Sequence, residues 1–293
     1  MNANPAKKPV LVAVQGNQPA LVRYAADEAR QRGTELVVLH VYGVVAAEVG
    51  AVLTTTSSPR DDAEAQAVLD QAKDVLSGMT EAPPARYLAE LGSVIGKIEE
   101  HVAHAQLLVV GADKLSWFDR VLGGAIARHL AEHAACPVVV VPPLRDLSVL
   151  YGGVCVAVDD NTESAGPLRF AFEEASARQS SLVVLHVVPE HTKLADLEAI
   201  RVSVAEVLAG WPEQFPDVVV TTRVVSDNEV VSAAARASVE SELLVVGRPR
   251  RHFLTGRAAA PRLTRATHCP LAVVDGSFGT RNASGPVGAA ASR

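Results

Sequence analysis

A repeat inside the chain restricts its fold more than any other feature. The hexapeptide LVVLHV occupies residues 36–41 and again residues 182–187, an offset of 146. The preceding segment repeats at the same offset, with RYAADEA at 23–29 answered by RFAFEEA at 169–175. A period of about 140 residues is far longer than the 20 to 50 of solenoid repeats, so the chain is predicted to be a duplicated domain.

Each half alternates short β-branched runs with longer amphipathic stretches, the pattern of a parallel sheet covered by helices on both faces. The expected strands of the first half lie at 10–14, 36–41, 85–89, 107–111 and 138–141. Their counterparts begin near Val154, Leu182, Val218, Leu243 and Leu271. The predicted fold class is therefore α/β, with two tandem doubly wound five-stranded parallel-sheet domains and four helices in each.

Domain boundaries follow from composition. We expect a flexible N-terminus at 1–8, a first domain at 9–143, a linker at 144–152 and a second domain at 153–275. The segment 276–293 is rich in Gly, Ala and Ser and is expected to be disordered.

Composition excludes several classes of function. The net charge of -6 lacks the basic excess of nucleic-acid-binding proteins. The most apolar region, 36–53, is interrupted by His, Gly and Glu and does not read as a membrane span. Three cysteines without a CxxC pair fit a reducing compartment, so a cytoplasmic protein that binds neither nucleic acid nor membrane is expected.

Several landmarks recur in order in both halves. They are AVD at 157–159, LHV in the second strand, VVG at the end of the fourth, and HAACPVVVV at 133–141 or THCPLAVV at 267–274. In these features the chain resembles the tandem-domain universal stress protein family. The resemblance implies an adenine-nucleotide alpha-hydrolase-like sandwich and a stress-response role, and many members of the family bind ATP whereas others bind no nucleotide.

The resemblance also implies where a nucleotide would bind in the first half. Nucleotide-binding members carry G-x2-G-x9-G-[ST] after the fourth strand, which here reads Gly111, Lys114, Gly124 and Ala125. One glycine and the hydroxyl are lost, but a lysine can pair with a phosphate. Gln15 stands where the family has an Asp at the end of the first strand.

Main-chain contacts complete the site that the resemblance implies. The backbone of Val41 would meet the adenine, and Val187 is its counterpart in the second half. Asp159 keeps the carboxylate of the first strand, but Gly247 is followed by Arg250 and Ala260, so the glycine motif is lost. ATP binding is predicted to be weak or undetectable, with any residual affinity in the first half.

Arginines replace the glycine loop of the second half. The cluster comprises Arg248, Arg250, Arg251, His252, Arg257, Arg262 and Arg265. One interpretation is a solvated face that neutralises acids such as Glu240 and Glu242. The other is a site for an anionic small molecule or an acidic protein, because guanidinium groups suit carboxylates and phosphates.

Other candidate residues have two interpretations. His40 and His186 are interpreted as structural, and His101 and His104 as helix surface rather than metal ligands. Cys136 and Cys269 are expected to be buried. The Asp159-Asp160 pair fits either a cation site or a turn, and the Trp117-Phe118 pair fits either a partner anchor or a cover for the pocket.

The predicted function is a ligand-binding or partner-binding stress-response module whose halves pack as an internal pseudo-dimer. No motif of a catalytic site is recognised, so the protein is not predicted to be an enzyme. The alternatives are a nucleotide-hydrolysing or nucleotide-transferring enzyme on the same fold, or a ligand-free interaction protein. A second copy of the chain remains a further candidate partner.

Overall fold

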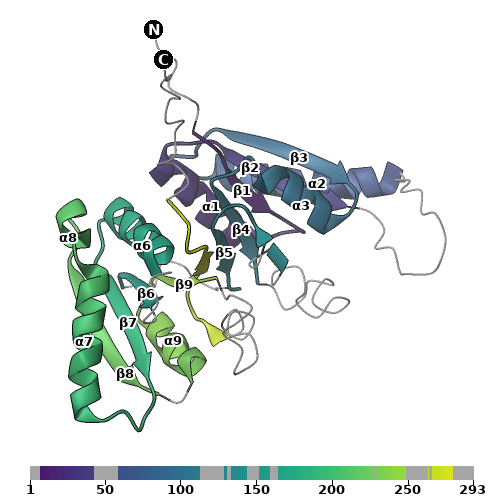
Figure 1. Cartoon of the computed structure of the whole chain (residues 1–293). Helices are drawn as coiled ribbons and strands as arrows, with labels where there is room; N and C mark the ends of the chain where they lie inside the picture. Colours follow the sequence, from purple (N-terminus) through teal and green to yellow (C-terminus); the bar gives the residue numbers. More distant parts are fainter. Residues whose placement is uncertain are drawn as a thin grey trace, which may run out of the picture.

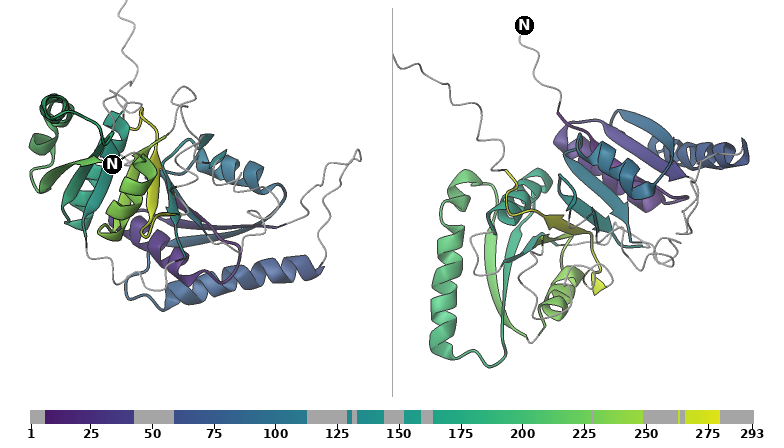
Figure 2. Two further views of the ribbon diagram at one scale, coloured as in Figure 1. Left: turned by 90° about the horizontal axis from the view of Figure 1, so that it is seen from below. Right: turned by 45° about the vertical axis from the view of Figure 1, so that its right-hand side comes forward.

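The structure is a computed structural model that places two α/β halves side by side (Figure 1). It describes residues 7–42, 59–112, 129–130, 133–143, 152–158, 164–227, 229–248, 263 and 266–279. Helices lie on both faces of the sheet, as two further views show (Figure 2).

The first half has its strands in the order β3-β2-β1-β4-β5, all parallel. The elements are β1 Val10–Ala13, α1 Pro19–Arg32, β2 Leu36–Tyr42, α2 Pro59–Ser77, β3 Ala85–Leu91, α3 Val94–Val102, β4 Leu107–Gly111 and β5 Val138–Val141. Each predicted strand is present, and α1 buries Leu21, Ala25 and Ala29 as its periodicity predicts.

The second half has the corresponding order β8-β7-β6-β9-β10, again all parallel. Its elements are β6 Val154–Val158, α6 Ala165–Arg178, β7 Leu182–Val188, α7 Leu194–Leu208, α8 Trp211–Gln214, β8 Val220–Ser226, α9 Val230–Val239, β9 Leu243–Gly247 and β10 Leu271–Val274. The start predicted at Val218 is wrong by two residues, because the Val218 amide donates to the Phe215 carbonyl in a turn.

The two halves share one ten-stranded sheet. Strand β10 pairs with β5 antiparallel, with Ala272 opposite Val139. An edge strand exposes unpaired N–H and C=O groups, and each half covers this edge of the other. The predicted pseudo-dimer with adjoining fifth strands is therefore confirmed.

The hydrophobic cores show how the halves are joined. On one face, a single core lies beneath α1, α2, α6 and α7 and includes side chains of both halves. On the other face each half has its own core, packed by α3 in the first half and by α9 in the second. The face of α1 and α6 is therefore the one on which the halves pack together.

Both ends of the described chain contact helices. The Lys7 ammonium donates to the Arg32 carbonyl over 2.9 Å. Phe278 lies edge-on to the buried Phe170 of α6, with ring centroids 5.6 Å apart. The described residues 276–279, which the sequence assigns to the tail, therefore form a turn that packs on α6.

Candidate functional site

The main candidate site of the first half lies where the strand order reverses. The chain runs from β1 outward to β2 and β3, then returns to place β4 on the other side of β1. Ala13 lies opposite Val110, so Gln15 and Gly111 follow neighbouring strands at the same edge of the sheet. Ligands of doubly wound folds bind at such a point.

The local geometry at this edge combines an exposed residue with an open glycine. The Gln15 amide donates to Oε1 of Gln18 over 3.0 Å in the turn before α1, and Gln15 itself is exposed. A Cβ atom at Gly16 would meet no atom of the described residues within 4 Å. Val41 is half-buried against the core of the α3 face. Open backbone at the start of a helix suits a phosphate or a polar ligand.

Part of the predicted site lies outside the described residues. These positions are Lys114, Gly124 and Ala125 in the first half and Asp159 in the second. The same is true of Trp117, Phe118 and Asp160. The described part of the predicted site is therefore Gln15, Val41 and Gly111 in the first half and Val187 and Gly247 in the second.

Two histidines support the strand ends in equivalent ways. His40 donates from Nδ1 to the Val14 carbonyl over 2.8 Å, and His186 donates from Nδ1 to the Val158 carbonyl over 3.1 Å. Each ring thus ties the second strand of its half to the end of the first. The structural interpretation of both histidines is confirmed.

In the second half, the residues that correspond to Val41 and Gly111 are Val187 and Gly247. Val187 is half-buried and Gly247 is exposed. A Cβ atom at Gly247 would meet Cγ of Pro167 at 3.5 Å, which is an ordinary contact. The described residues therefore do not require glycine at this position.

Arg248, the first member of the predicted arginine cluster, joins the two halves. Its Nη2 donates to the Ala134 carbonyl of the first half over 2.8 Å, and its Nη1 lies 3.3 Å from Oδ2 of Asp275. Its side chain is only 13% exposed. Including Arg248 in a surface cluster was wrong, because the guanidinium is used within the fold. The other members of the cluster lie outside the described residues.

One of the acids that this cluster could neutralise has another partner. Glu240 pairs with Arg223 over 2.9 Å.

The three cysteines are buried, and His101 has an acidic partner. Burial raises the pKa of each of the three cysteine thiols, Cys136, Cys155 and Cys269, to about 12. His101 lies 2.7 Å from Oε1 of Glu90 and so has an acidic partner. Within the described ranges, no three His, Cys, Asp or Glu side chains are grouped to hold a metal ion. Nor does any helix in those ranges have the length and apolar character needed to cross a bilayer.

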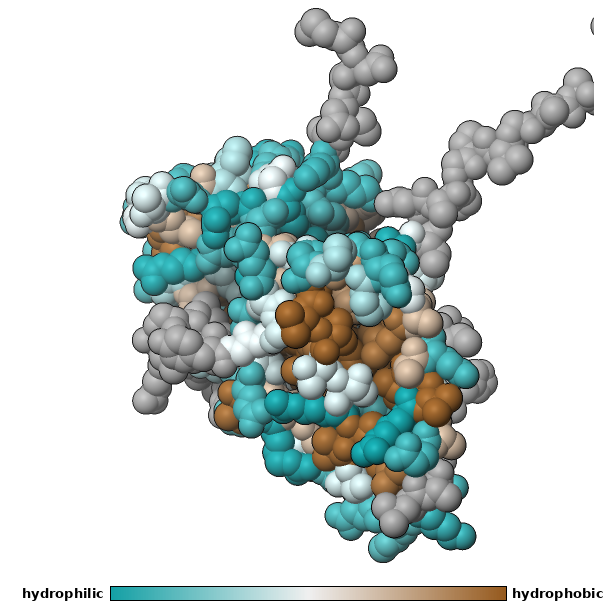
Figure 3. Space-filling model, turned by 90° about the vertical axis from the view of Figure 1, so that its left-hand side faces the viewer, coloured by the Kyte–Doolittle hydropathy of each residue, from teal (hydrophilic) through white to brown (hydrophobic). Residues whose placement is uncertain are grey.

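The sequence did not predict a groove beside the edge strand β8. Its volume is about 480 Å³. It is lined by Arg201, Ala205, Leu208, Ala209, Gly210, Pro212, Glu213, Thr222 and Val224. Phe172 stacks on Trp211 and Phe215 beside it, whereas the position equivalent to Phe172 in α1 is Ala26. Seen from the side of α7 and α8, apolar side chains gather in the middle of the surface, with polar side chains around them (Figure 3).

Comparison with known proteins matches both halves. A model of the universal stress protein family matches residues 7–142 and 151–275. A universal stress protein of Mycolicibacterium smegmatis is 29% identical over 289 residues, which cover 90% of this chain and 96% of that protein. Universal stress protein Rv2623 of Mycobacterium tuberculosis is 30% identical over 249 residues, which cover 77% of this chain and 80% of that protein.

A solved structure agrees with the fold. The crystal structure of a universal stress protein from Archaeoglobus fulgidus superposes with a TM-score of 0.66 at 15% identity. The match covers 92% of this chain and 97% of that one. At this identity the likeness shows a shared architecture.

Proposed function

This chain belongs to the universal stress protein family. From that premise we propose that it is a cytoplasmic stress-response module and not an enzyme. We propose further that its first half binds an adenine nucleotide weakly. The observation that carries the proposal is the open edge at Gln15 and Gly16, beside the strand that ends at Gly111. The three thiols are unpaired, which supports the reducing compartment.

The first half would hold the nucleotide mainly through its backbone. The main chain at Val41 would meet the base, and the glycines at 111 and 124 would let the chain approach the phosphates. Lys114 would supply one positive charge to the phosphates, whereas Ala125 lacks the hydroxyl donor of the family motif. Loss of a hydrogen bond to a charged group costs about 1.5 to 3 kcal/mol, or roughly ten- to a hundredfold in affinity.

The second half would not bind the nucleotide in this way. The residue after Gly247 is Arg248, whose side chain is engaged with Ala134 and Asp275. The segment from the β9 glycine to Cys269 is also three residues shorter than the segment from Gly111 to Cys136, since 269 - 247 = 22 and 136 - 111 = 25. A shorter loop without the glycines cannot follow the same path around phosphates.

Restoring the family motif tests this proposal. The double substitution Lys114→Gly and Ala125→Ser should strengthen ATP binding about ten- to a hundredfold in calorimetry, because it returns a flexible glycine and a hydroxyl donor. A matched control is Arg250→Gly, which changes the corresponding position of the second half.

The control should leave the affinity unchanged. If the double variant binds ATP no more tightly than the natural chain, the first-half pocket assumed here does not exist. Stronger binding by Arg250→Gly would place the nucleotide in the second half.

A second candidate function has one observation in its favour. Since Glu240 already pairs with Arg223, neutralising this acid does not explain the other arginines of the loop. We propose that Arg250, Arg251 and Arg257 recognise an anionic small molecule or an acidic protein. Hydrolysis or transfer of a nucleotide is the less favoured alternative.

A further inference from the structure

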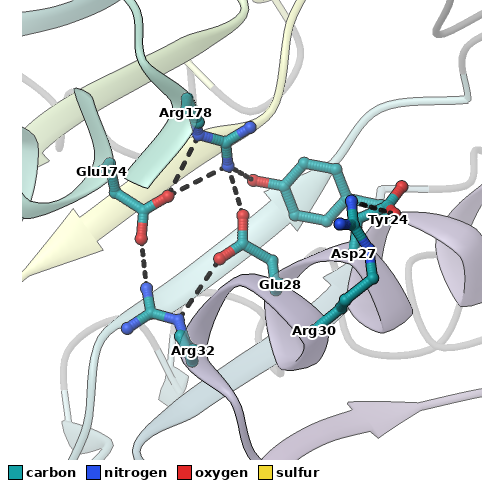
Figure 4. A network of polar contacts seen from close by, with 7 residues as sticks. All are labelled: Tyr24, Asp27, Glu28, Arg30, Arg32, Glu174 and Arg178. Carbon is teal, nitrogen blue, oxygen red and sulfur yellow. Dashed lines mark hydrogen bonds and ion pairs between the residues drawn. The ribbon is translucent and has the colours of Figure 1, made fainter. Parts of the chain in front are cut away.

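The contact between the two halves is closed to a second copy of the chain. Strands β5 and β10 cover each other, and four charged side chains form a ring between α1 and α6 (Figure 4). Arg32 pairs with Glu28 at 3.4 Å, and each arginine of the ring also pairs with the glutamate of the other helix. Arg178 pairs with Glu174 at 3.0 Å, and the side chains of Glu28 and Glu174 are 2% and 4% exposed. The positive and negative charges therefore balance one another inside the molecule.

The ten-stranded sheet ends in β3 on one side and in β8 on the other. These strands occupy equivalent places in the two halves, but the helices beside them differ. Helix α2 packs on β3, and the Lys73 ammonium lies 5.4 Å from the ring centre of Tyr87 in that strand. Helix α7, which corresponds to α2, packs less closely on β8, and the groove described above is lined by both. Strand β8 is therefore the more open edge.

The main chain of β8 has a row of unpaired groups along this edge. The Leu182 amide donates to the Val219 carbonyl, and the Asp227 amide donates to the Val188 carbonyl, each over 2.9 Å. Since alternate residues of a strand bond to the same neighbour, the odd-numbered residues of β8 face β7 and the even-numbered ones face outward. Among the described residues, no strand pairs with β8 on its outer side. The outward N–H and C=O groups, which an added strand could bind, belong to Val220, Thr222, Val224 and Ser226.

The side chains at this edge suit contact with another protein. Thr222 and Val224 lie on the side of α7, since both line the groove together with residues of that helix. Two valines nearby, Val202 of α7 and Val219 just before β8, are 58% and 71% exposed. The surface on this side has apolar side chains in its middle and polar ones around them (Figure 3), an arrangement typical of protein contacts.

We propose that two copies of the chain dimerise through β8, with the two strands antiparallel about a two-fold axis at Thr222. A two-fold axis is the commonest symmetry of homo-oligomers. Thr222 then lies opposite Thr222 of the partner subunit, and Val220 lies opposite Val224 of the partner subunit. These are the residues whose main-chain groups face outward. Pairs of threonines stabilise neighbouring strands, and the valines pack on each other.

Two neighbouring registers are less favourable. An axis at Arg223 would place two arginines directly opposite each other, and like charges in such positions are destabilising. An axis at Val224 would leave Val219 unpaired, because its opposite position would be 229, beyond the end of β8. With the axis at Thr222 the arginines are apart, and the exposed Val219 lies opposite Val225 of the partner subunit.

Charges at the groove are complementary across this axis. Helix α7 runs back from the end of β7 to the start of β8, so Glu213 of α8 lies toward the start of β8 and Arg201 of α7 lies further toward its end. The two-fold reverses the direction of the second strand, and it brings Glu213 of the partner subunit to the side of Arg201. In the single chain Arg201 pairs with Glu198 over 2.9 Å, but both side chains are exposed, so this pair opens at little cost.

Cysteine cross-linking tests the register in the full chain. Thr222→Cys places two cysteines opposite each other with Cα atoms about 5.5 Å apart, a separation that a disulfide spans. Ser226→Cys is the matched control, because Ser226 is exposed on the same strand but lies about 27 Å from its counterpart in this register. The three native thiols are buried and do not compete. Under mild oxidation Thr222→Cys should form a covalent dimer, and Ser226→Cys should not.

Sedimentation velocity over a range of protein concentrations measures the dimer without a cross-link. The natural chain should show a reversible dimer whose share grows with concentration. Thr222→Lys places two ammonium groups opposite each other and should raise the Kd of the dimer about fivefold or more. Ala89→Lys adds the same charge at an exposed position of β3, the equivalent strand of the first half, and should leave the Kd unchanged.

Three results would overturn the proposal. One is a natural chain that stays monomeric at every concentration, which would leave this edge to a different partner. Another is a dimer that Thr222→Lys does not weaken, since such a dimer uses another face. The third is cross-linking of Ser226→Cys as fast as that of Thr222→Cys. If Thr222→Lys folds poorly, the two cysteine variants, which keep small side chains at exposed positions, still decide the question.

Discussion

At the scale of single residues, the role of two histidines could be predicted from the sequence, whereas the burial of a glutamate could not. A histidine within an apolar strand was correctly interpreted as structural at His40 and at His186, since each bonds a neighbouring carbonyl. The burial of Glu28 was not predicted, because a glutamate on a helix is ordinarily solvated. The repeat does point to these residues, because Glu28 and Arg32 recur 146 residues later as Glu174 and Arg178. Periodicity alone cannot reveal a partner on another helix.

The thiols give a prediction at this scale. Each of the three cysteines has a pKa raised to about 12 by burial, so at pH 8 the native protein contains almost no thiolate, which is the reactive form. We expect reaction with Ellman's reagent to be about a thousandfold slower than that of a free thiol with a pKa of about 8.5. Added denaturant should release all three thiols.

The absorbance of the released product, followed with and without denaturant, measures the rate at which the thiols react. A native thiol that reacts at the rate of a small free thiol would show that its site opens readily to solvent. It would also contradict the burial of that cysteine beside the fifth strand of its half or in β6.

Among the secondary-structure elements, the strands were predicted better than their surroundings. Short β-branched runs bounded by polar residues predict strands well, and β4 and β5 have the bounds expected from the sequence. Strand β8 begins two residues late because a turn uses Val218. The short helix α8 and the groove beside it were not predicted, since both depend on the stacking of Trp211 and Phe215 on Phe172, which is a tertiary contact.

Alanine substitutions at two glycines test the packing of helices, and they should change the free energy of unfolding with opposite signs. A Cβ atom at Gly166 would lie 2.1 Å from the Asp275 carbonyl oxygen, so Gly166→Ala must displace the C-terminal turn from α6. We expect a loss of about 1 to 3 kcal/mol in the free energy of unfolding. At Gly96, within α3, the nearest atom of the described residues would be 3.8 Å from the added Cβ, so Gly96→Ala should gain up to about 1 kcal/mol from helix propensity.

Urea unfolding followed by circular dichroism measures both changes. A Gly166→Ala variant as stable as the natural chain would mean that the turn at 275–279 does not pack on α6 as described. A destabilised Gly96→Ala variant would contradict the space described around α3.

At the scale of the whole molecule, two similar halves are joined in one sheet but have different strand ends. The duplication, the strand order and the pairing of the fifth strands were predictable, because they follow from repeated patterns and from the need to cover an edge. The site was predictable only in part. Topology indicates which edge of the sheet would bind a ligand. The contact of Arg248 with the Ala134 carbonyl could not be predicted, because it joins residues 114 positions apart in the sequence.

We propose that the chain holds an adenine nucleotide in one half and does not convert it. The most direct measurement is equilibrium dialysis of the full chain against millimolar ATP and Mg²⁺, with mass spectrometry to identify and count the nucleotide on the protein. We predict intact ATP, with no more than one molecule per chain at saturation. Two molecules per chain, steady conversion of ATP to another nucleotide, or no bound nucleotide at all would contradict this account.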